Sequence, residues 1–344
     1  MLKEEYLNIS YVREDFKINM AFNKIGVIEY HDEKYIKEVM KIVERKIDSE
    51  ISFLEIKEYD FSELDQFSVI YDMISPFNKY LTEIMKIYYL NGTYIINNPF
   101  VISHYNKILQ TYKLIDMKMP IPKTMILPNE PDQSEKDFVG KPYFKVIFKK
   151  FNLPFIIKPY DGFANSDVFV INSHRDLYHV YKEKKAKIML VQEAIFPVDY
   201  YRVFVANKKN VCFLKRKPRF IEAENYDFYD FSLLTPELKN YIEKKSIHIC
   251  KEMGYDLSTI EWSITKDKKA FIIDVNDAPN IADPRKAKKA NLHFPEETYS
   301  WLVDKIANMI IEKSKINPRK RDVVMSPNFA ITLKNLVSGL KYSF

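Results

Sequence analysis

The stretch IEWSITKDKKAFIIDVN, residues 260–276, places two apolar runs on either side of a polar turn at residues 266–269. This pattern predicts a β-hairpin with Glu261 on one strand and Asp274 on the other. Asp274 and Asn276 are two residues apart, so they share a strand face, and the hairpin can bring Glu261 to the same face. We expect no cationic partner there, so that the two carboxylates and the amide would hold Mg²⁺ together with phosphates. The alternative is the solvated face of a two-stranded ladder.

Three features precede this hairpin, and their order gives them meaning. A lysine at a strand end usually extends into solvent on its own, but the paired acids further along the chain favour a phosphate site. In chain order the features are Lys107 near the start of a predicted helix over 102–116, Lys158 at the end of the apolar strand PFIIKP, and Gln192 and Glu193 in the apolar strand VQEAI.

The order of strands and helices predicts an α/β and α+β protein. Between residues 24 and 97, short apolar strands alternate with amphipathic helices, which indicates a small, mostly parallel sheet. Later in the chain, Thr235 and Pro236 mark the N-terminus of a long predicted helix. We expect four segments: an N-terminal α/β domain at 1–98, a central lobe at 99–190, a C-terminal lobe at 191–315 and a basic tail at 316–344.

Composition narrows the classes of function. The 344 residues carry a formal net charge of +6 and only 6 glycines, against roughly 24 in ordinary usage. Neither G-x-x-x-x-G-K-[ST] nor G-x-G-x-x-G occurs, which argues against Walker-type NTPases and Rossmann dehydrogenases. Basic and acidic residues are interspersed and no nucleic-acid-binding motif is present, so no nucleic-acid partner is expected. Without a long apolar run or signal peptide, we expect a cytoplasmic protein that does not contact a membrane.

The whole order, from Lys107 through Lys158 and the Gln-Glu strand to Asp274-x-Asn276, resembles the ATP-grasp superfamily, within it the glutathione-synthetase and RimK-like branch. The resemblance covers roughly residues 25–309 and includes MPIPKT at 119–124. It is similar above all to an uncharacterised subgroup that shares NNPF at 97–100. The resemblance implies a pre-ATP-grasp α/β domain followed by a two-lobed fold that holds ATP between two β-layers.

The resemblance also implies a role for each matching residue, with ATP and Mg²⁺ (or Mn²⁺) as cofactors. The expected set is Lys107 and Lys158 on the ATP phosphates; Gln192, Glu193, Ala194 and Ile195 at the adenine; Asp199 at the ribose; Arg202 and Arg216 as catalytic groups facing the phosphates or the acyl intermediate; and Glu261, Asp274 and Asn276 on the metal.

Three positions depart from the family pattern. The loop YDGFANS, residues 160–166, has one glycine where the family has several. Asp274 replaces the commoner Glu, and NDAPN at 276–280 replaces N-x-x-P-G. They predict a phosphate loop with fewer glycines, a reach to the metal that is one methylene shorter and a turn after the metal strand that is built differently.

The resemblance implies a ligase that joins a small-molecule or peptide carboxylate to an amine (or thiol) through an acyl phosphate. A phosphotransferase like the inositol-phosphate kinases is the alternative, with the basic cluster at 215–219 holding a phosphorylated substrate. A nucleotide-binding protein without turnover is the third reading. The substrates are expected to contact the loops at 129–140 and 220–234, and a homo-oligomer is left open.

Overall fold

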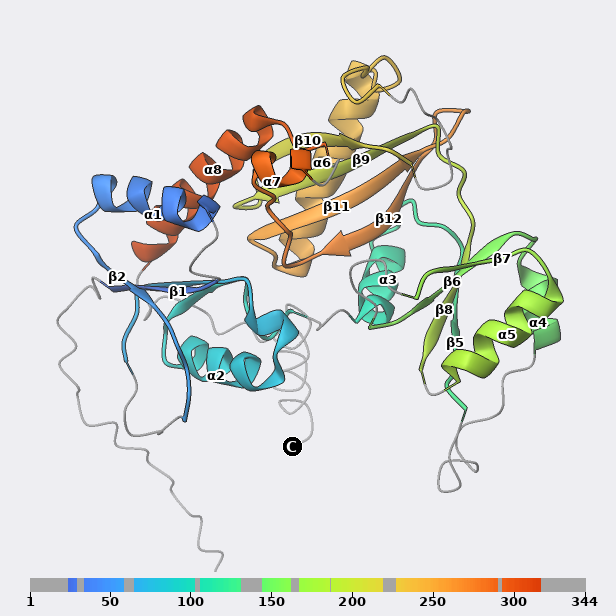
Figure 1. Cartoon of the computed structure of the whole chain (residues 1–344), viewed down its shortest axis with the longest axis horizontal. Coiled ribbons are helices and arrows are strands. Elements are labelled where there is room, and N and C mark those ends of the chain that lie inside the picture. The colour runs from blue at the N-terminus through green and yellow to red at the C-terminus, as the bar shows by residue number, and fades with distance from the viewer. Residues whose placement is uncertain are drawn as a thin grey trace, which may run out of the picture.

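The computed structural model describes residues 24–29, 34–58, 65–102, 106–130, 144–161, 167–185, 187–218, 227–289 and 293–316. Their strands form three four-stranded sheets (Figure 1). Several sequence predictions fall outside these residues: those for the glycine-poor stretch at 162–166, for residues 131–140 and 220–226 of the two substrate loops and for the tail beyond residue 316. No described helix is long and apolar enough to span a bilayer.

The first sheet confirms the predicted parallel α/β arrangement. Strands β1 (Lys24–Ile28), β2 (Glu50–Phe53), β3 (Val69–Asp72) and β4 (Tyr94–Ile96) lie parallel in the order β2-β1-β3-β4. Helices α1 (Lys34–Lys46) and α2 (Lys79–Leu90) cover opposite faces, and a short 3₁₀ helix, η1 (Ser75–Phe77), precedes α2 (Figure 1). Apolar residues recur along α1 at helical spacing, and this face of the helix is buried.

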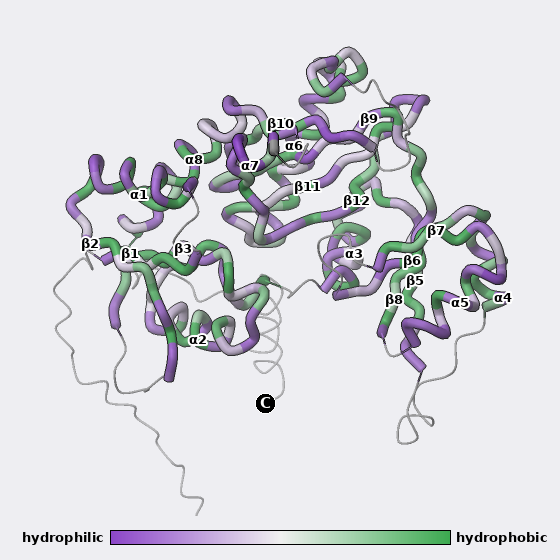
Figure 2. The backbone as a smooth tube through the Cα atoms, in the orientation of Figure 1, coloured by the Kyte–Doolittle hydropathy of each residue, from purple (hydrophilic) through white to green (hydrophobic). Residues whose placement is uncertain are grey.

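The second sheet is antiparallel. It contains β5 (Thr124–Leu127), β6 (Phe155–Pro159), β7 (Phe169–Ile171) and β8 (Met189–Glu193) in the order β5-β8-β6-β7. Helices α4 (Phe144–Lys150) and α5 (His174–Lys184) share an apolar core with one face of this sheet. Figure 2 shows the apolar strands in green and the mostly hydrophilic α5 in purple. The other face is left for residues such as Lys158 and Gln192, which alternate with the core residues along β6 and β8.

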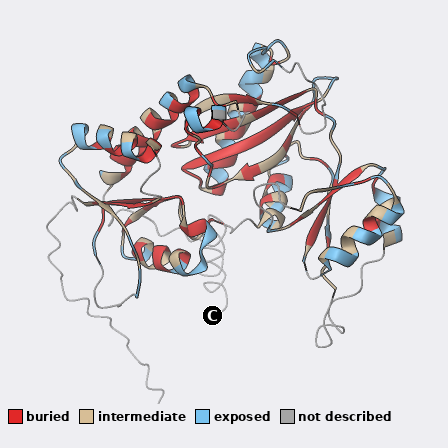
Figure 3. Ribbon diagram, viewed as in Figure 1, coloured by how far each residue is buried: buried red, intermediate tan, exposed pale blue. Residues whose placement is uncertain are grey.

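The third sheet is also antiparallel and is the most deeply buried. It contains β9 (Asp199–Ala206), β10 (Asn210–Arg216), β11 (Leu257–Ile264) and β12 (Ala270–Asn276) in the order β10-β9-β11-β12. Every residue of β11 is buried, as its red colour in Figure 3 shows. Helix α6 (Pro236–Met253) packs on one face of this sheet and begins, as predicted, at the Thr235 cap.

The last helices join the first and third sheets. After the short α7 (Pro284–Lys289), helix α8 (Glu296–Ser314) packs against α1 and β3 on one side and against β9 and β10 on the other. Its apolar residues belong to one cluster with Phe204 and Leu214 of the third sheet and Val27 of the first. The face of the third sheet opposite α6 is therefore covered at one end by α8.

Asn97, which directly follows β4, ties these two sheets together with its side chain. Its Nδ2 donates to the carbonyl oxygens of Leu257 (2.7 Å) and Asp277 (2.5 Å), and its Oδ1 accepts from the amides of Asp256 (2.6 Å) and Leu257 (2.9 Å). The side chain is fully buried, so these bonds replace all the water it would otherwise contact. The start of β11 and the residue after β12 are thereby fixed to the end of β4.

Candidate functional site

The predicted hairpin is present, and Glu261 and Asp274 are Cα partners across its two strands. Ile260, Trp262 and Val275 pack into the apolar cluster with α6. Because side chains alternate along a strand, Glu261, Asp274 and Asn276 lie on the opposite face. The Glu261 side chain is 6% exposed and the Asp274 side chain 24%.

Both carboxylates have a cationic partner, so the expectation that none would be present is wrong. Lys107 Nζ donates to Asp274 Oδ1 at 2.5 Å, and Arg202 Nη2 and Nε donate to Glu261 Oε1 at 2.6 Å and 3.2 Å. The hydroxyl of Tyr200 donates to Glu261 Oε2. The hairpin sequence could not reveal these partners, because Arg202 comes from the neighbouring strand β9 and Lys107 from a distant helix.

The Arg202 guanidinium is held in its charged form. Burial alone would lower its pKa, but the Glu261 carboxylate more than compensates, and the pKa is raised. A charged, donor-rich group is therefore fixed beside Glu261 on the open part of this face.

The two predicted phosphate lysines meet at β12 from separate elements. Helix α3 (Lys107–Asp116) begins at Lys107 rather than at residue 102, because the Asn106 side chain caps it by accepting from the amide of Leu109. The Lys107 amide donates at 3.0 Å to the carbonyl of Tyr160, just after β6. The start of α3 is thus attached to the strand that carries Lys158.

Lys158 contacts β12 at an irregularity in the pairing of β11 with β12. The register passes from Glu261–Asp274 to Trp262–Ile272, so Ile273 is an extra residue, a β-bulge. The Ile273 carbonyl accepts from Lys158 Nζ at 3.2 Å. The second and third sheets therefore touch through a lysine on one and a bulge on the other.

The segment predicted at the adenine connects these two sheets. Gln192 is buried and its side chain donates to Thr124 Oγ1 at 3.1 Å, so it holds β8 to β5. Glu193 is exposed at the end of β8, and its amide donates to the carbonyl of Lys123 at 2.9 Å.

Ala194 and Ile195 follow β8 in the connection to β9. In the described part of the chain neither forms a hydrogen bond with another backbone group. Their peptide groups lie in the segment that joins the second and third sheets.

The structure does not bring Asp199 to this group. Asp199 lies on the α6 face, where Lys215 Nζ is 3.1 Å from its Oδ1 and the Tyr201 hydroxyl donates to its Oδ2 at 2.6 Å. Both members of the Asp199–Lys215 pair are buried. A ribose contact from Asp199 would have to come from the wrong face of the sheet.

The described part of the basic cluster proposed for a phosphorylated substrate is divided between two faces. Lys215 and Arg216 are consecutive residues of β10, so they lie on opposite faces. Arg216 is the Cα partner of Tyr200 on β9 and lies on the same face as Arg202 and Glu261. Position 219 falls outside the described residues.

The oxygen ligands fit a metal that is shared with a nucleotide rather than a closed metal cage. Glu261, Asp274 and Asn276 supply two carboxylates and an amide, and each carboxylate already has a cationic partner. Among the described residues, no group of three or more His, Cys, Asp or Glu side chains could hold a metal ion. Mg²⁺ is commonly bound by one or two carboxylates together with substrate phosphates, and this set suits that mode.

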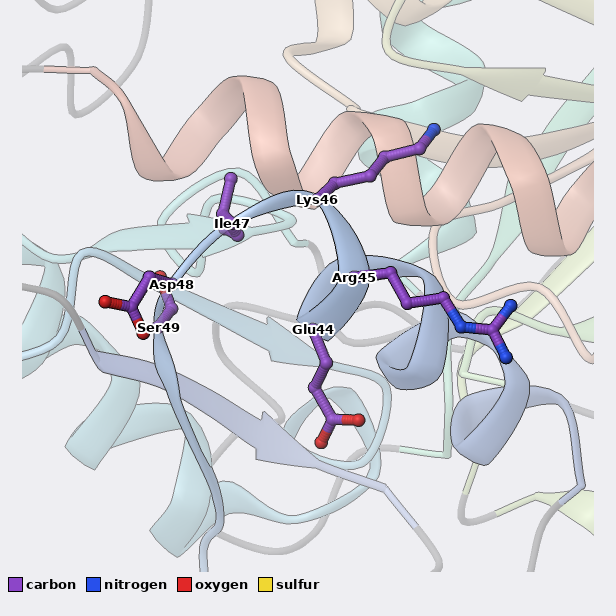
Figure 4. A pocket seen from close by; sticks show the side chains of 6 residues that line it. All are labelled: Glu44, Arg45, Lys46, Ile47, Asp48 and Ser49. Carbon is purple, nitrogen blue, oxygen red and sulfur yellow. The ribbon is translucent and has the colours of Figure 1, made fainter.

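A hollow of about 340 Å³ elsewhere on the protein is not part of this site. It lies where α1 ends and β2 begins and is lined by residues 44–49 (Figure 4). Lys46 points towards α8 and donates to Asn308 Oδ1 at 2.9 Å. None of the predicted site residues lines it.

Comparison with curated sequences shows similarity to a ligase. The chain is 26% identical over 172 residues to the D-alanine–D-alanine ligase of Petrotoga mobilis. The alignment covers 44% of this chain and 57% of that enzyme, so the chain matches little more than half of its relative's length. No protein-family profile matches the chain.

Solved structures match nearly the whole chain at low sequence identity. The D-alanine–D-alanine ligase of Bacillus anthracis complexed with ATP has a TM-score of 0.58 at 16% identity, over 85% of this chain and 98% of that one. The ATP-grasp ligase PsnB, complexed with a phosphomimetic variant of a minimal precursor, Mg and ADP, has a TM-score of 0.55 at 14% sequence identity. This match covers 86% of this chain and 100% of PsnB. The macrocyclase MdnC of Microcystis aeruginosa MRC, bound with the precursor peptide MdnA, has a TM-score of 0.56 at 16% sequence identity. This match covers 84% of this chain and 99% of MdnC. The chain therefore has the fold of ATP-grasp ligases.

Proposed function

We propose that this protein is an ATP-dependent ligase that activates a carboxylate as an acyl phosphate and joins it to an amine (or thiol). The observation that carries the proposal is that two lysines meet β12 between the second and third sheets, Lys107 at the Asp274 carboxylate and Lys158 at the Ile273 carbonyl. Cations from one side and carboxylates from the other are the groups needed around Mg-ATP. The order of these residues supports placement in the glutathione-synthetase and RimK-like branch.

In this proposal, Lys107 and Lys158 bind the phosphates of ATP. Glu261, Asp274 and Asn276 would hold Mg²⁺ (or Mn²⁺), which when bound neutralises phosphate charge and aligns the transferring oxygens. Lys107 leaves Asp274 for the phosphates as the nucleotide enters, because each then gains a partner of opposite charge. Ala194 and Ile195 meet the adenine edge, next to Glu193.

Arg202 and Arg216 act on the developing charge. Arg202 is fixed by Glu261, and Arg216 lies on the same face two strands from Glu261. A substrate carboxylate oriented between them would attack the γ-phosphate, and the guanidinium groups would stabilise the charge on the transferring oxygens. No side-chain nucleophile is required. The amine then attacks the acyl carbon, and phosphate leaves.

Trapping the acyl phosphate tests this proposal. The protein is incubated with Mg-ATP, hydroxylamine and a panel of small acids and peptides, and both ADP and hydroxamate are measured. We expect hydroxamate in proportion to ADP for at least one acid, and its loss in Asp274→Asn. A phosphorylated alcohol in place of hydroxamate would identify a phosphotransferase, and ATP binding without any product would identify a nucleotide-binding protein without turnover.

A further inference from the structure

Three aromatic rings gather at the end of β10. The His293 ring stacks on Phe228 with centroids 4.6 Å apart and meets Tyr229 edge-on at 4.9 Å. Burial, and to a lesser extent the charge of Arg216, lower the pKa of His293, so its ring is neutral at neutral pH and packs as an apolar group. Tyr229 is nevertheless 73% exposed. We call these three residues the aromatic wall.

The aromatic wall borders the charged part of the third sheet. Arg216 is the Cα partner of Tyr200, whose hydroxyl holds Glu261, so Arg216 lies on the face of the candidate site. Phe294, next to His293, packs on Phe204 further along that face, with ring centroids 6.2 Å apart. The wall therefore lies beside Arg216 at the end of β10, and Phe294 connects it to the apolar cluster under α8.

The loop that carries Phe228 and Tyr229 is anchored on the opposite face. The Lys215 ammonium donates to the carbonyl of Asp230, and the Phe231 ring packs on Tyr201 at 5.8 Å. The loop thus passes around the edge strand β10 and presents Tyr229 on the site face. A ring that is held in place loses little conformational entropy when a ligand packs against it.

We propose that the aromatic wall binds the side chain of the carboxylate substrate, which is an acid with an aromatic or long apolar group. This inference rests on the proposed function. The Arg216 guanidinium pairs with the carboxylate, since its planar fork matches two carboxylate oxygens. The apolar group packs on Tyr229 and His293, where aromatic faces and edges supply contact area without charge. Acids with short side chains reach Arg216 but not the wall.

Binding calorimetry with four probes tests the inference directly. In the presence of Mg²⁺ and a non-hydrolysable ATP analogue, 3-phenylpropionate is compared with propionate, and each with its neutral amide. We expect 3-phenylpropionate to bind most tightly, and Tyr229→Ala to weaken it at least about tenfold while leaving propionate unchanged. Tyr229→Phe should bind like the native protein. Arg216→Gln should remove the preference for acid over amide.

Tyr178 gives a matched control. It is also an exposed tyrosine edge-on to a histidine, His179 at 6.0 Å, but it lies on α5 of the second sheet. Tyr178→Ala should leave the affinity for all four probes unchanged. Equal binding of 3-phenylpropionate and propionate to the native protein, or equal loss in Tyr178→Ala and Tyr229→Ala, would overturn the inference.

Hydroxamate formation separates this inference from the ligase proposal. If 3-phenylpropionate binds in a Tyr229-dependent way but no acid gives hydroxamate, the aromatic wall stands and the ligase proposal fails. If hydroxamate forms equally well from both acids and is insensitive to Tyr229→Ala, the ligase proposal stands and the wall does not select the substrate.

Discussion

Two carboxylates at the third sheet, Asp256 just before β11 and Asp274 on β12, both pair with lysines but differ in access to water. Asp256 is 1% exposed and lies between Lys208 (3.1 Å) and Lys313 (3.3 Å), and it also accepts from the Tyr94 hydroxyl at 2.7 Å. The Asp274 side chain is 24% exposed and pairs with Lys107.

The difference separates a permanent junction from an exchangeable one. Asp256 has partners from three parts of the fold, namely β4, the turn after β9 and α8, and no ligand can reach all of them. The Asp274–Lys107 pair lies at an accessible edge, where a metal could bind Asp274 and a phosphate could bind Lys107. Sealed pairs should control stability, and accessible pairs should control activity.

Asp274→Asn should give the largest effect on activity. We expect turnover to fall by about 100-fold or more, because one metal ligand loses its charge. Loss of the Lys107 pair should lower the free energy of unfolding by only about 1 kcal/mol, since the pair is partly accessible. Turnover with Mg-ATP and the melting temperature without ligand measure both effects.

Asp267→Asn is the matched control, because Asp267 pairs with Lys269 in the exposed turn of the same hairpin. It should leave turnover unchanged. A fully active Asp274→Asn protein would remove Asp274 from the metal site and with it the basis of the ligase proposal.

Asp256→Asn should show the opposite pattern. Two lysines would lose their carboxylate in a buried place, so we expect the free energy of unfolding to fall by about 3 kcal/mol. Turnover of the folded protein at low temperature should stay near the native value. Urea unfolding followed by circular dichroism measures the free energy of unfolding, and an ADP assay measures turnover. Equal stability losses in Asp256→Asn and Asp274→Asn would contradict the distinction between a permanent and an exchangeable pair.

Lys158→Met should weaken ATP binding by about 10- to 150-fold, or roughly 1.5–3 kcal/mol, by removing a charge-assisted phosphate contact. The fold should persist, because Lys158 lies outside the apolar cores and its ammonium donates to the Ile273 carbonyl at an accessible position. Calorimetric titration with Mg-ATP measures the affinity. Lys187→Met serves as the control, since Lys187 is an exposed residue paired with Asp167. An unchanged affinity for ATP in Lys158→Met would show that Lys158 does not bind the phosphates.

Tyr200→Phe should have the smallest effect. It removes one hydrogen bond to Glu261, worth about 1 kcal/mol, so the Mg²⁺ concentration needed for half-maximal turnover should rise about fivefold. Tyr201→Phe is the adjacent control, because the Tyr201 hydroxyl donates to Asp199 on the other face. If both variants changed the Mg²⁺ requirement equally, Tyr200 would have no special role in positioning Glu261.

The sequence predicts the architecture well because the strands and helices are regular. Alternation in residues 24–97, the hairpin at 260–276 and the Thr235 cap all appear as expected. The sequence also suffices to predict that Asp199 and Arg202 lie on opposite faces of their strand. Residues three apart on one strand lie on opposite faces, which follows from the spacing alone.

The cationic partners of the carboxylates could not be predicted from the sequence. The Lys107–Asp274 contact joins residues 167 positions apart, one in helix α3 and the other in β12, and nothing in either local pattern indicates it. The bulge at Ile273 depends on how β11 and β12 pair, and the aromatic wall depends on a loop passing around an edge strand. Such contacts follow from tertiary packing rather than from periodicity.

The bonds of Asn97 have a consequence for motion. Because they join β4 to the start of β11 and to the residue after β12, the first and third sheets should move as one rigid body. Any change in the distance between Lys158 and β12 must then be a swing of the second sheet. One pivot of this swing is the connection between β8 and β9, residues 194–198, and the amides of Asp256 and Leu257 should be among the slowest to exchange with deuterium.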